Sequence, residues 1–388
     1  MHHDEMKLKI AFSVTNCICF DQRVLKIAEV VSSQGCEVTI IGRHLALPTV
    51  AMRRLGECCE EDSIPFRTKR FRMIFKRGFL FYKFINIRIF FYLLFHRFDT
   101  LVANDLDTLL PNFLVSKLKR IPLVYDSHEY FTGVPEIQKR PLVKWVWQMI
   151  EKAIFPHLKN VMTVSDSIAN EYEKQYGVRP AVICNCARAS DHISPYSKSE
   201  LGINEDHLLL ILQGGGINID RGGEELVEAV SRLENVTLLI AGSGDIVEQL
   251  REKTIALNSF DRIRFLPPVP WAEMMRYTKM ADAGLTLDKD TNLNYHFSLP
   301  NKLFDYISAG IPVIAGDLPE VRKIVSDCNC GIIIPSVTAE EIAAAIIKLR
   351  DNRELLNKLR QNAVNAFNNL NWKTESDKIV KFYSTVLK

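Results

Sequence analysis

The sequence lacks several patterns that mark common classes of nucleotide- and metal-binding protein. No Gly-x-Gly-x-x-Gly follows the first predicted strand, which ends at Val14, and this absence argues against a dinucleotide dehydrogenase. No Gly-Lys-Ser or Gly-Lys-Thr occurs, so a P-loop is excluded. None of the 9 cysteines belongs to a Cys-x-x-Cys pair, so we expect neither a zinc knuckle nor a thioredoxin-like site, and no structural metal.

The chain also has little net charge and no export signal. Its formal net charge is only +3 over 388 residues, which argues against a dedicated nucleic-acid-binding protein. Charged residues occupy the N-terminus, where a signal sequence needs an apolar run, so we expect no export. An odd number of cysteines without such a signal favours reduced thiols. These observations predict a cytoplasmic protein.

What is present is an alternation of apolar strands and helices. The segments Leu8–Val14, Asp21–Gln34 and Glu37–Gly42 have the patterns of a strand, an amphipathic helix and a second strand. Such a unit opens a parallel sheet. The later strands are nearly continuous apolar runs, which is typical of strands buried on both faces. The alternation restarts after a polar, irregular segment around residues 185–199.

The length of the chain predicts two domains, because 388 residues exceed the size at which one core usually keeps growing. The predicted class is α/β, with two doubly wound Rossmann-like domains at residues 1–190 and 191–370. The final segment, residues 371–388, has the pattern of an amphipathic helix, and we expect it to pack back on the first domain.

A predicted helix in the second half of the chain carries both an anion-binding N-terminus and a carboxylate side chain. Pro300 suits a first helical turn and Gly310 suits a helix stop, so the helix should begin at Pro300 or Asn301. Its unpaired N–H groups, with Lys302 in the first turn, form a place for phosphate. Asp305 lies on the same face and would bind a sugar diol. The alternative is that Asp305 pairs with Lys302 on an ordinary surface helix.

Polar and glycine-rich loops follow the predicted strands, where ligands of open parallel sheets bind. In the second half, glycines allow close approach of the backbone to a ligand and Arg221 can pair with phosphate; the loop residues are Gly214, Gly215, Gly216, Gly242 and Gly244. The pair at 242 and 244 is equally consistent with a tight turn. In the first half, Asn104, Asp105, His128 and Glu129 follow two strands. His128 would contact a sugar or phosphate, or shuttle a proton, unless it is merely structural.

Residues 66–98 interleave basic and aromatic side chains. Lys83 and Arg88 interrupt the most apolar part, so a transmembrane helix is not expected. We expect a basic amphipathic surface that contacts anionic lipid headgroups. Two alternatives stay open: an aromatic core stripe with a solvated basic face, and a nucleic-acid surface, which lacks any recognised motif.

The ordered motifs of the second half resemble family 4 glycosyltransferases of the GT-B fold. The motifs are the glycine loop with Arg221-Gly222, Ile240-Ala-Gly-Ser-Gly-Asp245, Arg264-Phe-Leu-Pro-Pro268 and Pro300-Asn-Lys-Leu-Phe-Asp-Tyr306. In the first half, Asp21-Gln-Arg-Val24, Asn104-Asp105 and Asp126-Ser-His-Glu129 are similar to the acceptor domain of a polysaccharide-biosynthesis subgroup. The resemblance implies two domains with a cleft between them and a C-terminal crossover helix.

The resemblance implies roles for individual residues. Asp305 would bind the nucleotide ribose, Arg221 the donor diphosphate, and Phe265–Val269, including Leu266, would line the base. His128 would face the transferred sugar. Asn301 and the glycine loops would complete the donor site, and Asn104, Asp105 and Glu129 would lie on the acceptor side.

Two positions depart from the family pattern. Phe297 stands where the family has the first of two glutamates, so Ser298, His296 or Asn294 would contact the donor sugar instead. The arginine that commonly follows the loop glycine is missing, and Lys302 would supply that second positive charge.

The resemblance therefore implies a retaining, hexosyltransferase-type enzyme. It would move a sugar from a nucleotide diphosphate sugar to a hydroxyl of a glycan or lipid-linked glycan, without metal or other cofactor. The partners expected are this donor, this acceptor and an anionic membrane surface on the inner face of the cell membrane, with no nucleic acid. Two alternatives remain: a sugar-nucleotide epimerase of the same architecture, and a catalytically silent GT-B scaffold in glycan assembly.

Overall fold

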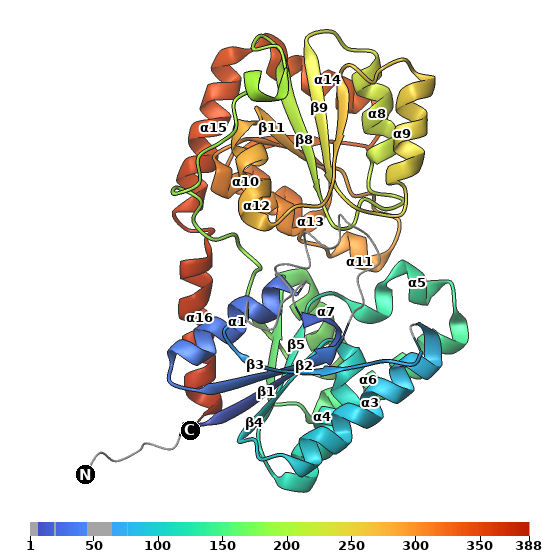
Figure 1. Cartoon of the computed structure of the whole chain (residues 1–388), viewed down its shortest axis with the longest axis vertical. Helices are drawn as coiled ribbons and strands as arrows, with labels where there is room; N and C mark the ends of the chain where they lie inside the picture. Colours follow the sequence, from blue (N-terminus) through green and yellow to red (C-terminus); the bar gives the residue numbers. More distant parts are fainter. Residues whose placement is uncertain (1–6, 19–20, 45–63, 76, 388) are drawn as a thin grey trace, which may run out of the picture. The chain divides into compact units, whose positions relative to one another are not determined.

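The computed structural model describes residues 7–18, 21–44, 64–75 and 77–387. The chain forms two compact units, one made of residues 1–184 and 375–388 and the other of residues 185–374. Each unit is built around a parallel β-sheet flanked by helices (Figure 1). The prediction of two doubly wound α/β domains is confirmed.

The first unit contains a seven-stranded sheet of order β3-β2-β1-β4-β5-β6-β7. Its strands are β1 (Lys9–Cys17), β2 (Glu37–Arg43), β3 (Arg67–Phe71), β4 (Thr100–Asn104), β5 (Leu123–Ser127), β6 (Asn160–Thr163) and β7 (Ala181–Val182). Its helices are α1 (Gln22–Ser33), α3 (Gly78–Phe95), α4 (Leu106–Lys119), α5 (Pro135–Gln138), α6 (Pro141–Ile154) and α7 (Asp166–Tyr176), and part of α16 (Trp372–Val386) joins them.

The second unit contains a six-stranded sheet of order β10-β9-β8-β11-β12-β13. Its strands are β8 (Leu208–Gly214), β9 (Val236–Gly242), β10 (Ile263–Leu266), β11 (Ala283–Thr286), β12 (Val313–Gly316) and β13 (Gly331–Ile334). Its helices are α8 (Gly223–Ser231), α9 (Val247–Ala256), α10 (Trp271–Met280), α11 (Leu293–His296), α12 (Asn301–Ala309), α13 (Pro319–Asp327), α14 (Ala339–Asp351) and α15 (Arg353–Phe367).

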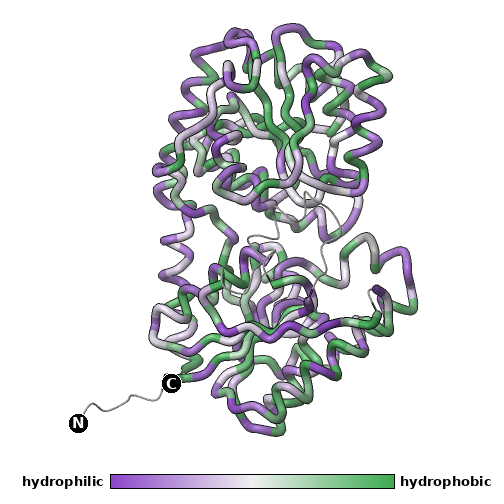
Figure 2. The backbone as a smooth tube through the Cα atoms, viewed as in Figure 1, coloured by the Kyte–Doolittle hydropathy of each residue, from purple (hydrophilic) through white to green (hydrophobic). Residues whose placement is uncertain are grey.

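The strands are apolar because both faces of each sheet are covered. In the second unit, Leu208–Leu212 of β8 and Val236–Ala241 of β9 are buried residue after residue, as expected for a parallel sheet between helices. These strands are coloured as hydrophobic in Figure 2, whereas the surrounding helices alternate between the two colours. In both sheets the order reverses beside the first strand of the unit, β1 or β8, so loops at the carboxyl ends of these strands and their neighbours are positioned to bind ligands.

The first unit ends at Cys184, earlier than the boundary expected after residue 190. The intervening residues belong to the second unit because they bond to α12: Asn185 donates to Asn301 at 2.9 Å, and the Ser190 hydroxyl donates to the carbonyl of Ser308 at 2.9 Å. Helix α16 rejoins the first unit at Glu375, whose carboxylate accepts from the backbone N–H of Cys184 at 2.9 Å.

The basic and aromatic segment forms a charged edge strand, β3, followed by α3. The strand was not predicted, because Arg67–Phe71 alternates exposed and half-buried residues and carries no apolar run. The predicted amphipathic character of the segment is wrong for α3, whose apolar side chains include both buried Ile85 and Ile89 and exposed Phe79 and Phe95. Among the described helices, α3 is long and apolar enough to cross a membrane, by length and composition only. Lys76 lies outside the described residues.

Candidate functional site

Helix α12 begins as predicted, with Pro300 at its N-cap and Gly310 in the left-handed conformation at its C-cap. Asp305 does not rely on Lys302 for its partners. One of its oxygens accepts from Nε2 of Gln213 at 3.1 Å and the other from the indole N–H of Trp271 at 3.0 Å. These donors come from β8 and α10, so two neighbouring elements fix the orientation of the carboxylate. A carboxylate has about four acceptor positions, so these two hydrogen bonds alone do not saturate it.

A second cluster combines two cations with a buried carboxylate. Arg221 lies 3.7 Å from Oδ1 of Asp288, and its guanidinium stacks 4.8 Å from the ring centroid of Tyr295. Burial lowers the pKa of Lys302; Asp288 raises that pKa and Arg221 lowers it further, so the three groups share one electrostatic environment. Asp288 is only 2% exposed, and within the described part of the chain its oxygens accept no hydrogen bond. The cluster thus combines two cationic side chains with a buried carboxylate that orients Arg221. Such an arrangement suits a diphosphate ligand.

The glycines of the two loops have different roles. The carbonyl oxygen of Gly214 accepts from the N–H of Ser243 at 3.1 Å, and the N–H of Ile217 donates to the carbonyl oxygen of Ser243 at 2.9 Å. A Cβ on Gly242 would overlap the Gly214 carbonyl, and one on Gly244 would overlap the backbone of Ile217. These two glycines therefore join the loops, as the tight-turn alternative stated.

Gly215 and Gly216 face more open surroundings. No atom lies within 4 Å of a Cβ built on Gly215, and one built on Gly216 would first meet the guanidinium of Arg221 at 3.9 Å. These are the positions in the loop where a ligand has room to approach the backbone next to Arg221.

Replacing Gly242 with alanine is expected to destabilise the second unit by about 2–5 kcal/mol, because the residue has φ 134° and no space for a methyl group. Gly215→Ala is the matched control, in the same pair of loops, and should change stability by less than about 0.5 kcal/mol. Urea denaturation followed by circular dichroism measures both. Equal stability of the two variants would show that the loops do not depend on this backbone contact.

The residues near the position of the missing glutamate form a separate group. The ring of His296 lies 2.9 Å from Asp290, Asn294 is buried, and the hydroxyl of Ser298 has no hydrogen-bond partner among the described residues. Leu266 ends β10, paired with Ala241 of β9. Leu266 thus lies at the end of β10, and Ser298 lies between α11 and α12 of the same unit. The roles of both residues stay predictions.

In the first unit, His128 bridges two carboxylates. Its Nδ1 lies 3.3 Å from Asp105 and its Nε2 lies 3.3 Å from Asp126, while its backbone N–H donates to Asp105 at 2.8 Å. Burial lowers the pKa of His128, but Asp105, Asp21 and Asp126 outweigh burial and raise the value to about 10. The imidazole is therefore cationic at neutral pH. This differs from the predicted proton shuttle, because its pKa lies far from neutrality.

Asp126 anchors this network. Arg23 of α1 donates to it through Nε at 2.9 Å and through Nη2 at 2.7 Å, and both side chains are almost fully buried. Burial raises the pKa of Asp126, but Arg23 and His128 outweigh it and hold the pKa below its usual value.

Asp105 is the strained member of the network. It has φ 58° and ψ 166°, a conformation that costs about 1–3 kcal/mol in a residue other than glycine. Burial raises its pKa, His128 lowers it, and the nearby carboxylates of Glu129 and Asp107 raise it, so that the pKa of Asp105 is about 8. Asn104 is buried and donates to the carbonyl of Ser13 at 3.1 Å, which makes it a link between β4 and β1. Backbone strain and a perturbed carboxylate mark Asp105 as the best candidate for ligand contact among these residues.

Several contributors to these networks were not predicted as site residues, among them Asp288, Trp271 and Arg23. Asp288 lies just beyond β11, so its place after a strand is a signal that sequence reasoning could have used. Trp271 is the first residue of α10 and Arg23 lies in the first turn of α1. Their distance in sequence from Asp305 and Asp126 hides the contacts. Among the described residues no group of three or more His, Cys, Asp or Glu side chains is arranged to hold a metal ion.

Two family models match this chain. Residues 22–189 match the model described as Glycosyltransferase Family 4, and residues 197–366 match the model described as Glycosyl transferases group 1. The two matches leave only the chain ends and a short segment between them unmatched.

Curated relatives match smaller parts of the chain. A phosphatidyl-myo-inositol mannosyltransferase of Mycobacterium leprae is 29% identical over 153 residues, which is 39% of this chain and 39% of the relative. A D-inositol 3-phosphate glycosyltransferase of Corynebacterium efficiens is 23% identical over 295 residues, 70% of this chain and 68% of the relative. The chain thus spans about two fifths of the length of the mycobacterial relative.

Solved structures share the fold over nearly the whole chain. A sucrose-phosphate synthase of Thermosynechococcus elongatus aligns with a TM-score of 0.77 at 16% identity, over 98% of this chain and 99% of its own. The Anabaena protein HepE, solved with UDP and glucose, aligns with a TM-score of 0.74 at 17% identity, over 97% and 100% of the two chains.

Proposed function

This chain belongs to the family 4 glycosyltransferases of the GT-B type, and we propose that it moves a hexose from a nucleotide diphosphate sugar to a hydroxyl of a glycan or lipid-linked glycan. The anomeric configuration would be retained, as the resemblance to the family implies. The observation that carries the proposal is the pairing, in one domain, of an oriented carboxylate at Asp305 with the cation cluster of Arg221 and Lys302.

The carboxylate and the cations suit different parts of one donor. Asp305 would accept hydrogen bonds from the ribose hydroxyls, and Gln213 and Trp271 hold it in place beforehand. Arg221, Lys302 and the first-turn N–H groups of α12 would bind the diphosphate. HepE was solved with UDP and glucose, and this supports a nucleotide diphosphate as the ligand class.

The chemistry proposed is electrostatic stabilisation of the leaving group. When the bond from the anomeric carbon to the diphosphate oxygen breaks, negative charge develops on that oxygen. Arg221 and Lys302 would meet this charge without moving, since Asp288 and Tyr295 already position the guanidinium. No metal is needed for this step, and we assign no protein nucleophile.

The first domain would hold the acceptor. Asp105 is half-buried, with a pKa raised to about 8, and lies against the cationic ring of His128. Such a carboxyl can orient a sugar hydroxyl by accepting or donating a hydrogen bond. His128 would act through Asp105, as a positioning residue. The relatives named for phosphatidyl-myo-inositol and for inositol phosphate support an acceptor with several hydroxyls.

A contact with an anionic membrane surface is part of the proposal. Residues 66–98 place cations on β3 beside the exposed aromatic side chains of α3, a combination that favours headgroups over bulk water. This would keep a cytoplasmic enzyme on the inner face of the membrane, where lipid-linked glycans are built.

Titration calorimetry with nucleotide diphosphate sugars tests the donor site. The wild-type protein should bind at least one such donor, and Asp305→Ala should weaken that binding by about a hundredfold or more, since two hydrogen bonds to a charged group are lost. Asp305→Asn keeps the side-chain volume should the alanine variant fail to fold. Glu340→Ala, at an exposed carboxylate ion-paired with Arg232, is the control.

These titrations, together with analysis of the products formed from each donor with and without an acceptor, separate this proposal from its alternatives. If the protein binds no nucleotide diphosphate, the proposed transferase function is refuted. Binding without transfer to any acceptor would favour the silent scaffold, and interconversion of the donor sugar would favour the epimerase.

A further inference from the structure

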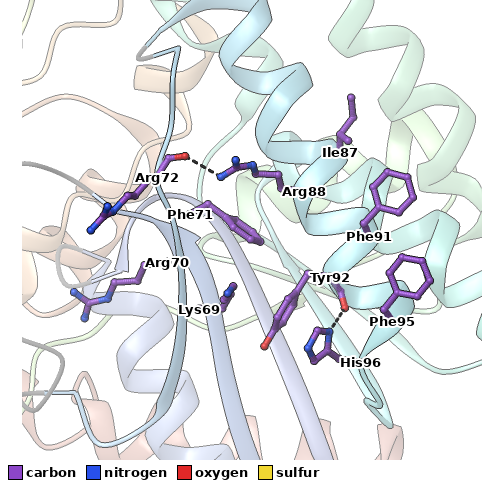
Figure 3. Close-up of a pocket in the computed structure, with 10 residues that line it drawn as sticks. All are labelled: Lys69, Arg70, Phe71, Arg72, Ile87, Arg88, Phe91, Tyr92, Phe95 and His96. Carbon is purple, nitrogen blue, oxygen red and sulfur yellow. Dashed lines mark hydrogen bonds between the residues drawn. The ribbon is translucent and has the colours of Figure 1, made fainter.

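The strongest feature outside the two ligand networks is a shallow groove of about 500 Å³ between β3 and α3. Figure 3 shows Lys69, Arg70 and Arg72 with Phe71 on the strand side of the groove, and the aromatic side chains of α3 with Arg88 on the helix side. The residues that line it are Lys69, Arg70, Phe71, Arg72, Ile87, Arg88, Phe91, Tyr92, Phe95 and His96. The two sides differ in chemistry, so the groove fits a ligand with an anionic part and an apolar part.

The charged side chains that line the groove are all basic. Residues 66–98 contain nine Lys and Arg residues and no Asp or Glu. Arg67 forms an ion pair with Glu37 at the sheet edge, so it contributes little to the positive field. Lys69 and Arg72 are exposed, and Arg88 donates to the backbone carbonyl of Arg72 at 2.8 Å while stacking on Phe84. The backbone bond leaves the charge of Arg88 uncompensated, and it adds to that of Lys69 and Arg72.

The helix side of the groove exposes aromatic side chains, which are rarely so exposed on the surface of a soluble protein. Phe91 is 50% exposed and Phe95 is 76% exposed, and their rings stack with centroids 6.1 Å apart. Ile87 is exposed one turn before Phe91. These three apolar side chains line the helix side of the groove beside the cations. Exposed aromatic and aliphatic side chains next to Lys and Arg are typical of surfaces that lie in the interface of an anionic membrane.

The buried face of α3 decides how the helix meets a bilayer. Phe81, Ile85, Ile89 and Leu93 recur every four residues and are buried within the first unit. Crossing a membrane would require these side chains to leave that core, whereas lying in the plane of the interface leaves them in place. The length and apolar composition of α3 therefore serve an in-plane contact.

We propose that this groove binds anionic phospholipid of a bilayer leaflet, with the headgroup phosphate in the positive field of Lys69, Arg72 and Arg88 and an acyl chain along Ile87, Phe91 and Phe95. The inference deepens the membrane contact in the proposed function and rests on it. It adds a headgroup site at defined residues, whereas the proposed function requires only a diffuse basic surface.

Cosedimentation of the full-length protein with vesicles tests the groove. The wild-type protein should bind an equal mixture of phosphatidylcholine and phosphatidylglycerol at least about tenfold more tightly than phosphatidylcholine alone. Lys69→Glu combined with Arg72→Glu should remove that preference, and Phe91→Ser combined with Phe95→Ser should lower binding to both kinds of vesicle. Circular dichroism and thermal unfolding check that each variant is folded.

The control is Lys174→Glu combined with Lys348→Glu, which makes the same change of net charge at exposed lysines outside the groove. If this control loses as much binding as the strand variant, or if both groove variants bind like wild type, the headgroup site is refuted. Binding to an immobilised acidic peptide but not to vesicles would refute the lipid in favour of a protein partner. Nucleotide affinity should be unchanged in the groove variants, so loss of the lipid site and failure of the donor site are distinguishable.

Discussion

Arg221→Ala is expected to lower kcat by about a hundred- to a thousandfold, the range for loss of one preorganised group that stabilises a developing negative charge. The guanidinium is held between the buried carboxylate of Asp288 and the ring of Tyr295, so its position is set before the donor binds. Initial rates at saturating donor measure the effect. Because the charge on the diphosphate increases as its bond to the sugar breaks, kcat should fall more than donor affinity.

Two further variants make this expectation specific. Arg221→Lys keeps the charge but loses the planar group that stacks on Tyr295, so it should restore only part of the rate. Arg232→Ala, which removes an exposed arginine paired with Glu228 and Glu340 in the same domain, should leave kcat unchanged. An Arg221→Ala variant that retains wild-type kcat would contradict the assigned role.

Arg23→Met is expected to destabilise the first unit by about 3–5 kcal/mol, because it leaves Asp126 buried without its principal counter-charge. The double variant Arg23→Met with Asp126→Leu should recover most of that loss, since the buried charge is then gone as well. Arg179→Ala breaks an exposed pair with Glu173 and should cost no more than about 1 kcal/mol. Urea denaturation measures the free energy of unfolding of all three variants. Additive losses in the double variant would contradict the role of Arg23 as the counter-charge of Asp126.

The pKa shifts give the pH dependence of this network. The pKa of Asp126 is lower in the folded protein than its usual value of about 3.9, so its contribution is present above that value and is lost as the pH falls below it. The pKa of His128 is raised to about 10, so its contribution is complete below about 6.5 and is lost as the pH rises through 10. The contributions of Asp126 and His128 are therefore both complete between about pH 3.9 and about pH 6.5, whereas Asp105, whose pKa is raised to about 8, opposes them as the pH rises from about 3.9 to 8.

The apolar pattern predicted the sheets because strands that are buried on both faces need apolar residues at nearly every position. The sequences of β1, β8 and β9 are therefore continuous apolar runs. The start of α12 was predicted for a similar local reason: Pro300 restricts the backbone where the helix begins. The edge strand β3 was missed because its residues are charged and the strand gains its order from β2, not from a local pattern.

The side-chain networks were predicted only in part. Asp305 was identified from its place on α12, but its partners Gln213 and Trp271 depend on the packing of separate elements. Proton transfer, one of the roles predicted for His128, requires a pKa near neutrality. The fold places Asp105 and Asp126 on either side of the ring, and that juxtaposition of β4 and β5 is invisible in the linear chain.

The backbone contacts of Gly242 and Gly244 with the loop that leads to Arg221 have a consequence for redesign. The framework of these two glycine loops is set by main-chain atoms, so it does not depend on which side chains stand at positions 294 and 296–298. Combinatorial libraries at Asn294, His296, Phe297 and Ser298 can therefore be screened for altered sugar preference without rebuilding the loops. Restoring a glutamate at position 297 is the natural first member of such a library.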